Sequence, residues 1–181
     1  VESIRTLVLP TDAGPALSAA AEDLRQLFAM CYGISLTVLE DDGRRPKHAI
    51  YLDDSGVVHA RISNDGFFIH RQRTCVYIAG DGESGVVNGV YAICAKLLGA
   101  RWYWAGELGL ELVEPAATKF PEGHWRERPA YEMRTLYPIH TDFARRNRLV
   151  RHFEFNHALA KVFTPALYEV EPALFAEVHG H

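Results

Sequence analysis

The chain has 181 residues, with 19 Lys and Arg against 23 Asp and Glu, and 48% of its residues are hydrophobic. These values are typical of globular proteins and exclude a wholly disordered chain. The slight negative charge argues against a nucleic-acid-binding protein. No apolar run approaches the roughly 18 residues of a membrane span. The three cysteines cannot form a fully paired disulfide framework.

Strand and helix patterns alternate over residues 1–113. Apolar residues recur at steps of three and four between Pro15 and Gly33, and again over about 84–98, which predicts two amphipathic helices. Together with the strands, this order predicts an α/β domain with a mixed sheet and both helices packed on one face. The strands are expected at short apolar runs, over 4–9, 34–39, 49–52, 66–70, 75–79 and 101–104.

The pattern changes after residue 113. Residues 114–129 carry three prolines and are expected to form a linker. Residues 130–181 resemble the incomplete start of a second domain, with a strand over 131–137 and a helix within 143–155. No charged-then-apolar leader precedes the first strand, so no signal peptide is visible. A mature secreted protein and a piece of a longer chain would both fit this start.

A glycine-rich turn joins the strand over 75–79 to the second helix. Gly80, Gly82 and Gly85 match the G-x-G-x-x-G pattern in the strand-to-helix context of a dinucleotide site. However, Asp81 and Glu83 would place negative charges beside a bound pyrophosphate. We therefore favour a tight turn and expect no cofactor, with nucleotide binding kept as a third hypothesis. No His-Glu-x-x-His motif occurs, so no metal site is expected either.

The tryptophans allow two interpretations. Trp102, Trp104 and Trp125 could form a platform on which sugar rings stack, which would make the chain a stand-alone carbohydrate-binding module. Alternatively, Trp102 and Trp104 bury their rings against a neighbouring domain. We favour the second interpretation because these two residues occupy a short strand beside the proline-rich linker.

Four stretches of the sequence follow one another in the same order as in a known protein family: residues 84–91, 97–103, 106–107 and 128–134. Over residues 4–137 the sequence resembles the N-terminal α/β domain that precedes the catalytic (β/α)8 barrel in bacterial glycoside hydrolases of the α-glucuronidase and β-hexosaminidase type. The resemblance implies a periplasmic or extracellular, non-catalytic accessory domain that positions or caps the barrel. The catalytic acids would lie on later barrel strands, and carbohydrate would be bound through the parent enzyme.

The same resemblance points to three substrate-binding residues. Residues 131–137 would be the first barrel strand, with Arg134 where related enzymes place an arginine that hydrogen-bonds sugar hydroxyls. His140 and His157 would lie near the same barrel mouth. The hexosaminidase pattern has Gly after this arginine, whereas Thr135 stands here. A salt bridge between domains is the alternative role for Arg134, and both roles stay open at this point.

Overall fold

Two compact units make up the chain, Val1–Arg151 and His152–His181, and each is described by itself. In the second unit, the described residues form one short helix, α5 (Pro165–Val170). Every other element below belongs to the first unit. The computed structural model describes residues 1, 3–52, 62, 64–113, 117–120, 123–136, 140–149 and 165–170.

A six-stranded mixed sheet forms the centre of the first unit, with the strand order β2-β1-β3-β5-β4-β8. The pairs among β2, β1, β3 and β5 are parallel, whereas β4 pairs antiparallel with both β5 and β8. The strands are β1 (Thr6–Leu9), β2 (Thr37–Glu40), β3 (Ala49–Leu52), β4 (Phe67–Gln72), β5 (Cys75–Gly80) and β8 (His124–Glu127).

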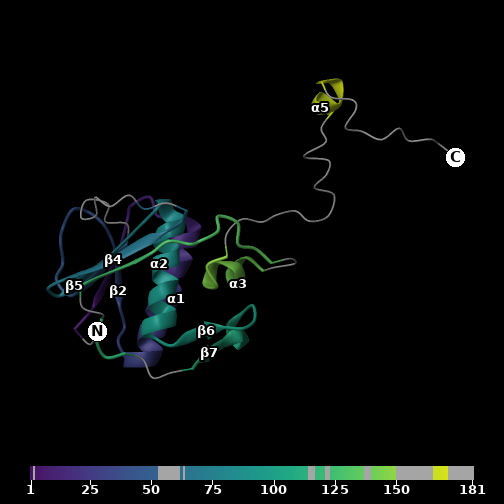
Figure 1. The fold of residues 1–181 in the computed structure, drawn as a ribbon. Coiled ribbons are helices and arrows are strands. Elements are labelled where there is room, and N and C mark those ends of the chain that lie inside the picture. Colours follow the sequence, from purple (N-terminus) through teal and green to yellow (C-terminus); the bar gives the residue numbers. More distant parts are fainter. Residues whose placement is uncertain are drawn as a thin grey trace. The chain divides into compact units, whose positions relative to one another are not determined.

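Helices α1 (Pro15–Tyr32) and α2 (Gly82–Leu97) lie side by side on one face of this sheet (Figure 1). Their apolar faces and the inward side chains of the strands form one core. Pro15 occupies the first turn of α1, and Gly33 ends that helix with a φ of 66°, as the sequence pattern predicts. The predicted α/β class, with a mixed sheet and two helices on one face, is confirmed.

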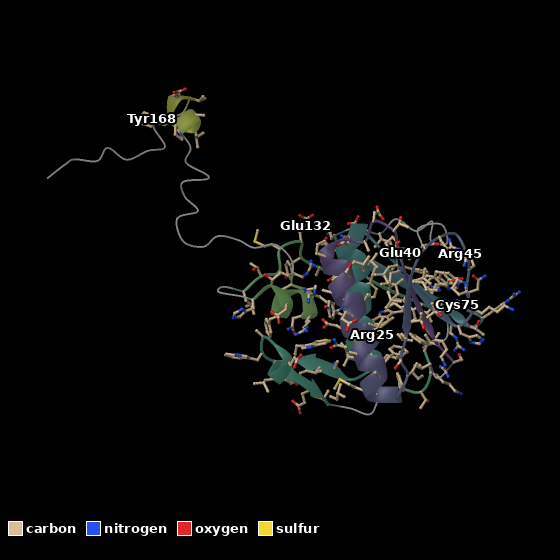
Figure 2. The ribbon with its side chains drawn as sticks, turned by 180° about the vertical axis from the view of Figure 1, so that it is seen from behind. Arg25, Glu40, Arg45, Cys75, Glu132 and Tyr168 are labelled. Carbon is tan, nitrogen blue, oxygen red and sulfur yellow. The ribbon has the colours of Figure 1, made fainter. Side chains whose placement is uncertain are left out.

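The opposite face of the sheet carries a smaller cluster. Val8, Ala49 and Tyr51 are buried there, with Cys75 and Tyr77 packed against them. The rings of Tyr51 and Tyr77 stack with their centroids 5.0 Å apart. Arg45 and Cys75 lie on the side of the sheet away from the helices (Figure 2). Because side chains alternate along a strand, each strand contributes to both clusters.

A small hairpin follows α2. It consists of β6 (Ala100–Trp102) and β7 (Leu110–Leu112), joined by a loop that contains the short 3-10 helix η1 (Glu107–Gly109). The strand predicted over 101–104 therefore begins one residue earlier and ends at Trp102, where the chain turns into this loop.

The segment predicted as a linker contributes a strand to the sheet. Within 114–129, β8 pairs with β4 in register, with His70 opposite His124. Alternating side chains explain why this segment forms a strand. Trp125 packs against the core, while the neighbouring His124 and Arg126 are exposed. The first unit runs on to Arg151, so the expected boundary at 113 lies inside it.

The segment expected to open a second domain differs from its prediction. Among its described residues, 131–136 contain an isolated bridge at Arg134 and no strand. Tyr131, Met133 and Leu136 are exposed, so this segment lacks the buried side chains that would hold a strand in a sheet. The helix predicted within 143–155 corresponds to α3 (Thr141–Arg146). No helix among the described residues is both long and apolar enough to cross a bilayer.

Candidate functional site

Arg134 turns its guanidinium toward the α/β domain. Its Nε donates a hydrogen bond to the carbonyl oxygen of Arg148 at 3.3 Å, and its Nη1 donates to the carbonyl of Tyr131. Its Nη2 lies 3.5 Å from Oδ2 of Asp65, in an ion pair whose arginine side chain is 17% exposed. Arg134 therefore forms a salt bridge inside the first unit and links Tyr131 and Arg148 to Asp65 in the turn before β4.

The same side chain lines a cavity of about 210 Å³ between β8, α2 and the chain after β8. Asn88, a buried amide in its lining, donates from Nδ2 to the carbonyl of Asp65 at 2.9 Å. Two other lining residues pair with each other: Nη1 of Arg148 donates to Oε1 of Glu127 at 2.8 Å. A hydroxyl-bearing ligand would meet guanidinium donors and an amide here, which is the chemistry that holds sugar hydroxyls.

Of the two histidines predicted beside Arg134, His140 lies among the described residues and does not line this cavity. His140 is exposed immediately before α3, where its carbonyl accepts a hydrogen bond from the N–H of Ala144. It is absent from the cavity's lining. His157 lies outside the described residues.

A network of charged and hydroxyl groups attaches α3 to the two long helices. Arg146 donates from Nε and Nη2 to the two carboxylate oxygens of Asp23 on α1, at 3.0 and 2.9 Å. The hydroxyl of Tyr91 on α2 donates to Asp23 at 2.7 Å and accepts from Nε of Arg145 at 2.9 Å. We call these four residues the α3 anchor. The fork of Arg146 on both oxygens is the geometry in which guanidinium and carboxylate recognise each other best.

The α3 anchor is largely shielded from solvent. The side chains of Asp23 and Arg146 are 12% and 15% exposed. The hydrogen bond to Asp23 raises the pKa of Arg146, and burial raises the pKa of the Tyr91 hydroxyl well above its ordinary value. Arg146 therefore stays charged and Tyr91 neutral at neutral pH. Loss of the Asp23 carboxylate would remove the forked partner of Arg146 in a partly dry environment and leave its Nη1 paired with Asp142 at 3.3 Å.

A second set of contacts joins α3 to the loop between β6 and β7. The N–H of Gly106 donates to Oδ2 of Asp142 at 3.0 Å, and this bond lowers the pKa of the carboxyl. The side-chain amide of Asn147 donates to the carbonyl of Trp102 at 3.1 Å. Residues 140–149 therefore contact both long helices and the hairpin loop.

The three tryptophans predicted as a platform occupy different environments. Trp102 is buried, with its ring edge-on to Tyr91 at 5.5 Å. Trp104 is 75% exposed. Trp125 is half-buried on β8, and the ammonium of Lys96 lies 4.1 Å from its ring centroid. Trp102 and Trp125 line separate cavities with no lining residue in common, so they do not form one platform.

The glycine-rich turn brings β5 and α2 into direct backbone contact. A Cβ on Gly80 would collide with the backbone of Val86, and one on Gly85 would collide with the carbonyl of Gly66. The carboxylate of Glu83 accepts a hydrogen bond from the N–H of Gly14 at 2.8 Å. Close packing of strand and helix thus accounts for the glycines at 80 and 85 without a ligand.

The α3 anchor is the feature that the sequence pattern does not reveal. Asp23 and Arg146 are separated by 123 residues, and nothing in either local segment indicates the other. The available signal is Asp23 itself, a charged residue between the apolar positions Ala20 and Leu24 of an amphipathic helix. Among the described residues, no group of three or more His, Cys, Asp and Glu side chains is placed to hold a metal ion.

The comparisons with known proteins find similarity among solved structures. No family model matches the sequence, and no curated protein matches it. Among solved structures, part of this chain is similar to part of a GH138 enzyme described as targeting pectin rhamnogalacturonan II. The TM-score is 0.37, the sequence identity is 21%, and the match covers 51% of this chain and 9% of that one. The chain thus resembles a portion of a glycoside hydrolase in structure, and no conclusion on substrate or activity rests on this similarity.

Proposed function

We propose that this chain is the non-catalytic N-terminal accessory domain of a carbohydrate-active glycoside hydrolase, where it positions or caps a catalytic barrel. The α3 anchor is the observation that carries the proposal. A domain that positions its neighbour must hold the first elements of the adjoining segment in a defined orientation. The forked pairing of Arg146 with Asp23 does this for α3, because two parallel hydrogen bonds fix direction as well as distance.

Exposed apolar side chains near α3 support a capping role. Tyr103, Trp104 and Leu108, on the loop between β6 and β7, are 62%, 75% and 101% exposed. This loop is bonded to α3 through Gly106 and Asp142. Large exposed apolar groups that gather in one region mark surfaces at which another protein surface packs. The burial of aromatic residues against a neighbouring domain, favoured from the sequence, therefore stays part of the proposal for Trp104, while Trp102 is already buried within this unit.

The link to carbohydrate and to a barrel rests on the resemblance of residues 4–137 to accessory domains of glycoside hydrolases. A role for Arg134 in contacting sugar belongs to the same proposal. Its cavity offers guanidinium and amide donors, although Arg134 itself is engaged by Asp65 and two carbonyls. The periplasmic or extracellular location is proposed with it, and cell fractionation of the source organism tests that part.

The decisive experiment compares the native polypeptide with the 181-residue chain. An antibody raised against this chain captures the native protein, whose intact mass is measured, and both samples are assayed on a panel of chromogenic glycosides. We expect a native mass well above 20.3 kDa, turnover by the native protein, and none by the 181-residue chain. Turnover by the short chain alone, or a native mass of 20.3 kDa, would contradict the proposal.

Direct carbohydrate binding is a second candidate function, favoured by the 75% exposure of Trp104. An exposed indole offers an apolar face to a sugar ring. Titration with neutral and uronic oligosaccharides should then change the tryptophan emission of the wild type and of Trp125→Phe, and should leave the emission of Trp104→Phe unchanged. A flat titration across the panel removes this candidate.

A further inference from the structure

A second cavity lies between β8 and α2, apart from the cavity of Arg134. Its volume is about 250 Å³, which is just below the roughly 300–1,000 Å³ of most ligand sites and suits a ligand with a single ring. Its walls are almost wholly apolar. They come from β4, β5, α2, the chain before β8 and β8 itself, through Ile69, Val76, Ile93, Leu97, Phe120 and Trp125.

The walls are rigid, because five of these six side chains are buried in the main core and the sixth, Trp125, is held from two sides. Trp125 packs edge-on against Phe67, with ring centroids 5.3 Å apart. Its other contact is the ammonium of Lys96, 4.1 Å from the ring centroid. A cavity framed by core residues is preformed, so a ligand entering it would not have to order the walls first.

The charges at this cavity favour an anion. Lys96 and Arg71 contribute two cations to its lining, and no described lining residue is acidic. The nearby carboxylate of Glu127 is 3.6 Å from Nζ of Lys96, but its other oxygen is only 2.8 Å from Nη1 of Arg148. One carboxylate is therefore shared between two cations, which leaves the positive charge of Lys96 only partly compensated.

We propose that this cavity binds a small aromatic carboxylate, with the ring among the apolar walls beside Trp125 and the carboxylate at Lys96 and Arg71. Charge complementarity selects the anionic end, and the apolar walls select the ring. Small aliphatic acids lack the apolar area to cover the walls, and neutral aromatic compounds bring no anion to Lys96 and Arg71. This inference stands apart from the proposed accessory role, so either can fail without the other.

Phenylacetate is the probe, with 2-phenylethanol as its neutral analogue and acetate as its ringless one. Calorimetry gives the affinities. A ¹H–¹⁵N spectrum of the full chain reports the location, because the chain has three tryptophans and Trp125→Phe identifies the indole N–H signal of that residue. We expect phenylacetate to shift the Trp125 signal alone, to bind at least about fivefold tighter than 2-phenylethanol, and acetate not to bind.

Three variants sharpen the test. Lys96→Met keeps the aliphatic stem and should weaken phenylacetate binding about fivefold, whereas Lys47→Met, at a lysine outside the lining, should leave it unchanged. Leu97→Phe should abolish binding by filling the cavity, with its circular dichroism checked for a native fold. Equal binding by the neutral analogue, a shift of another indole signal, or no shift of Trp125 at millimolar ligand would overturn the proposal.

Discussion

Helices α2 and α3 belong to the same compact unit and are held in it by different chemistry. Most residues of α2 are buried, and it packs against β5 and α1 through apolar side chains. No residue of α3 is buried, and polar contacts dominate its attachment: Arg146 and Arg145 donate to Asp23 and Tyr91, and Asp142 accepts from Gly106. Apolar contact is strong but non-directional, whereas paired charges fix orientation. The domain thus builds its core with α2 and fixes the orientation of α3 itself with paired charges.

The largest effect should come from truncating the α2 core. Ile93→Ala removes a side chain that is 1% exposed and should lower the free energy of unfolding by about 3 kcal/mol, through lost burial and a residual cavity. Urea melts at low and high NaCl concentration measure this, and the loss should be the same at both. Met30→Ala, at a 60% exposed position of α1, is the control and should change the free energy of unfolding by less than about 0.5 kcal/mol.

Removing the carboxylate of the α3 anchor should be the next largest effect. Asp23→Ala leaves Arg146 without its forked partner and should cost about 2–3 kcal/mol, concentrated in α3. Hydrogen exchange followed by mass spectrometry should show faster exchange over 141–149 and little change in α2. Unchanged protection of α3 would contradict the view that charge holds this helix.

The neighbouring Glu22→Ala is a matched control for that experiment. Glu22 pairs with Arg25, which is labelled on α1 in Figure 2, and the two side chains are 45% and 38% exposed. Water competes for an exposed pair, so this substitution should change the free energy of unfolding by less than about 0.5 kcal/mol. A loss of unfolding free energy equal to that of Asp23→Ala would mean that burial does not make the Asp23 pair stronger than the exposed pair.

A smaller effect is expected from the hydroxyl that joins α2 to the anchor. Tyr91→Phe keeps the buried ring but removes the donor to Asp23 and the acceptor for Arg145, at a cost of about 1–1.5 kcal/mol. In a double-mutant cycle with Asp23→Ala, the two losses should fall short of adding, since both remove the same hydrogen bond. If the two losses of unfolding free energy simply add, the Tyr91 hydroxyl stabilises the fold independently of Asp23.

The smallest effect should depend on pH. The hydrogen bond from Gly106 lowers the pKa of Asp142 below its ordinary value of 3.8, so its ionised form stabilises the folded state. That contribution is fully present above about pH 5 and is lost as the pH falls through the lowered pKa. Asp142→Asn should therefore reduce stability slightly at neutral pH, and the difference from wild type should shrink below about pH 3. A stability difference between wild type and Asp142→Asn that grows as the pH falls would contradict this prediction.

Local patterns in the sequence account for much of the fold. The three- and four-residue spacing of α1 and α2, the proline at the start of α1 and Gly33 at its end predict the two helices close to their observed limits. The tight turn at Gly80 and Gly85 is predicted in the same way. Each of these features depends on residues that are close together in the sequence, so a short stretch of sequence is enough to predict it.

β8 and the α3 anchor were decided only by the tertiary structure. β8 lies in a stretch whose prolines indicate a linker, and it becomes a strand because the edge of β4 offers it backbone partners and the core takes up Trp125. The forked pair of Asp23 and Arg146 spans 123 residues. Local spacing carries no information about such a contact, because the packing of α1 beside α2 creates the partly dry site in which the two charges meet.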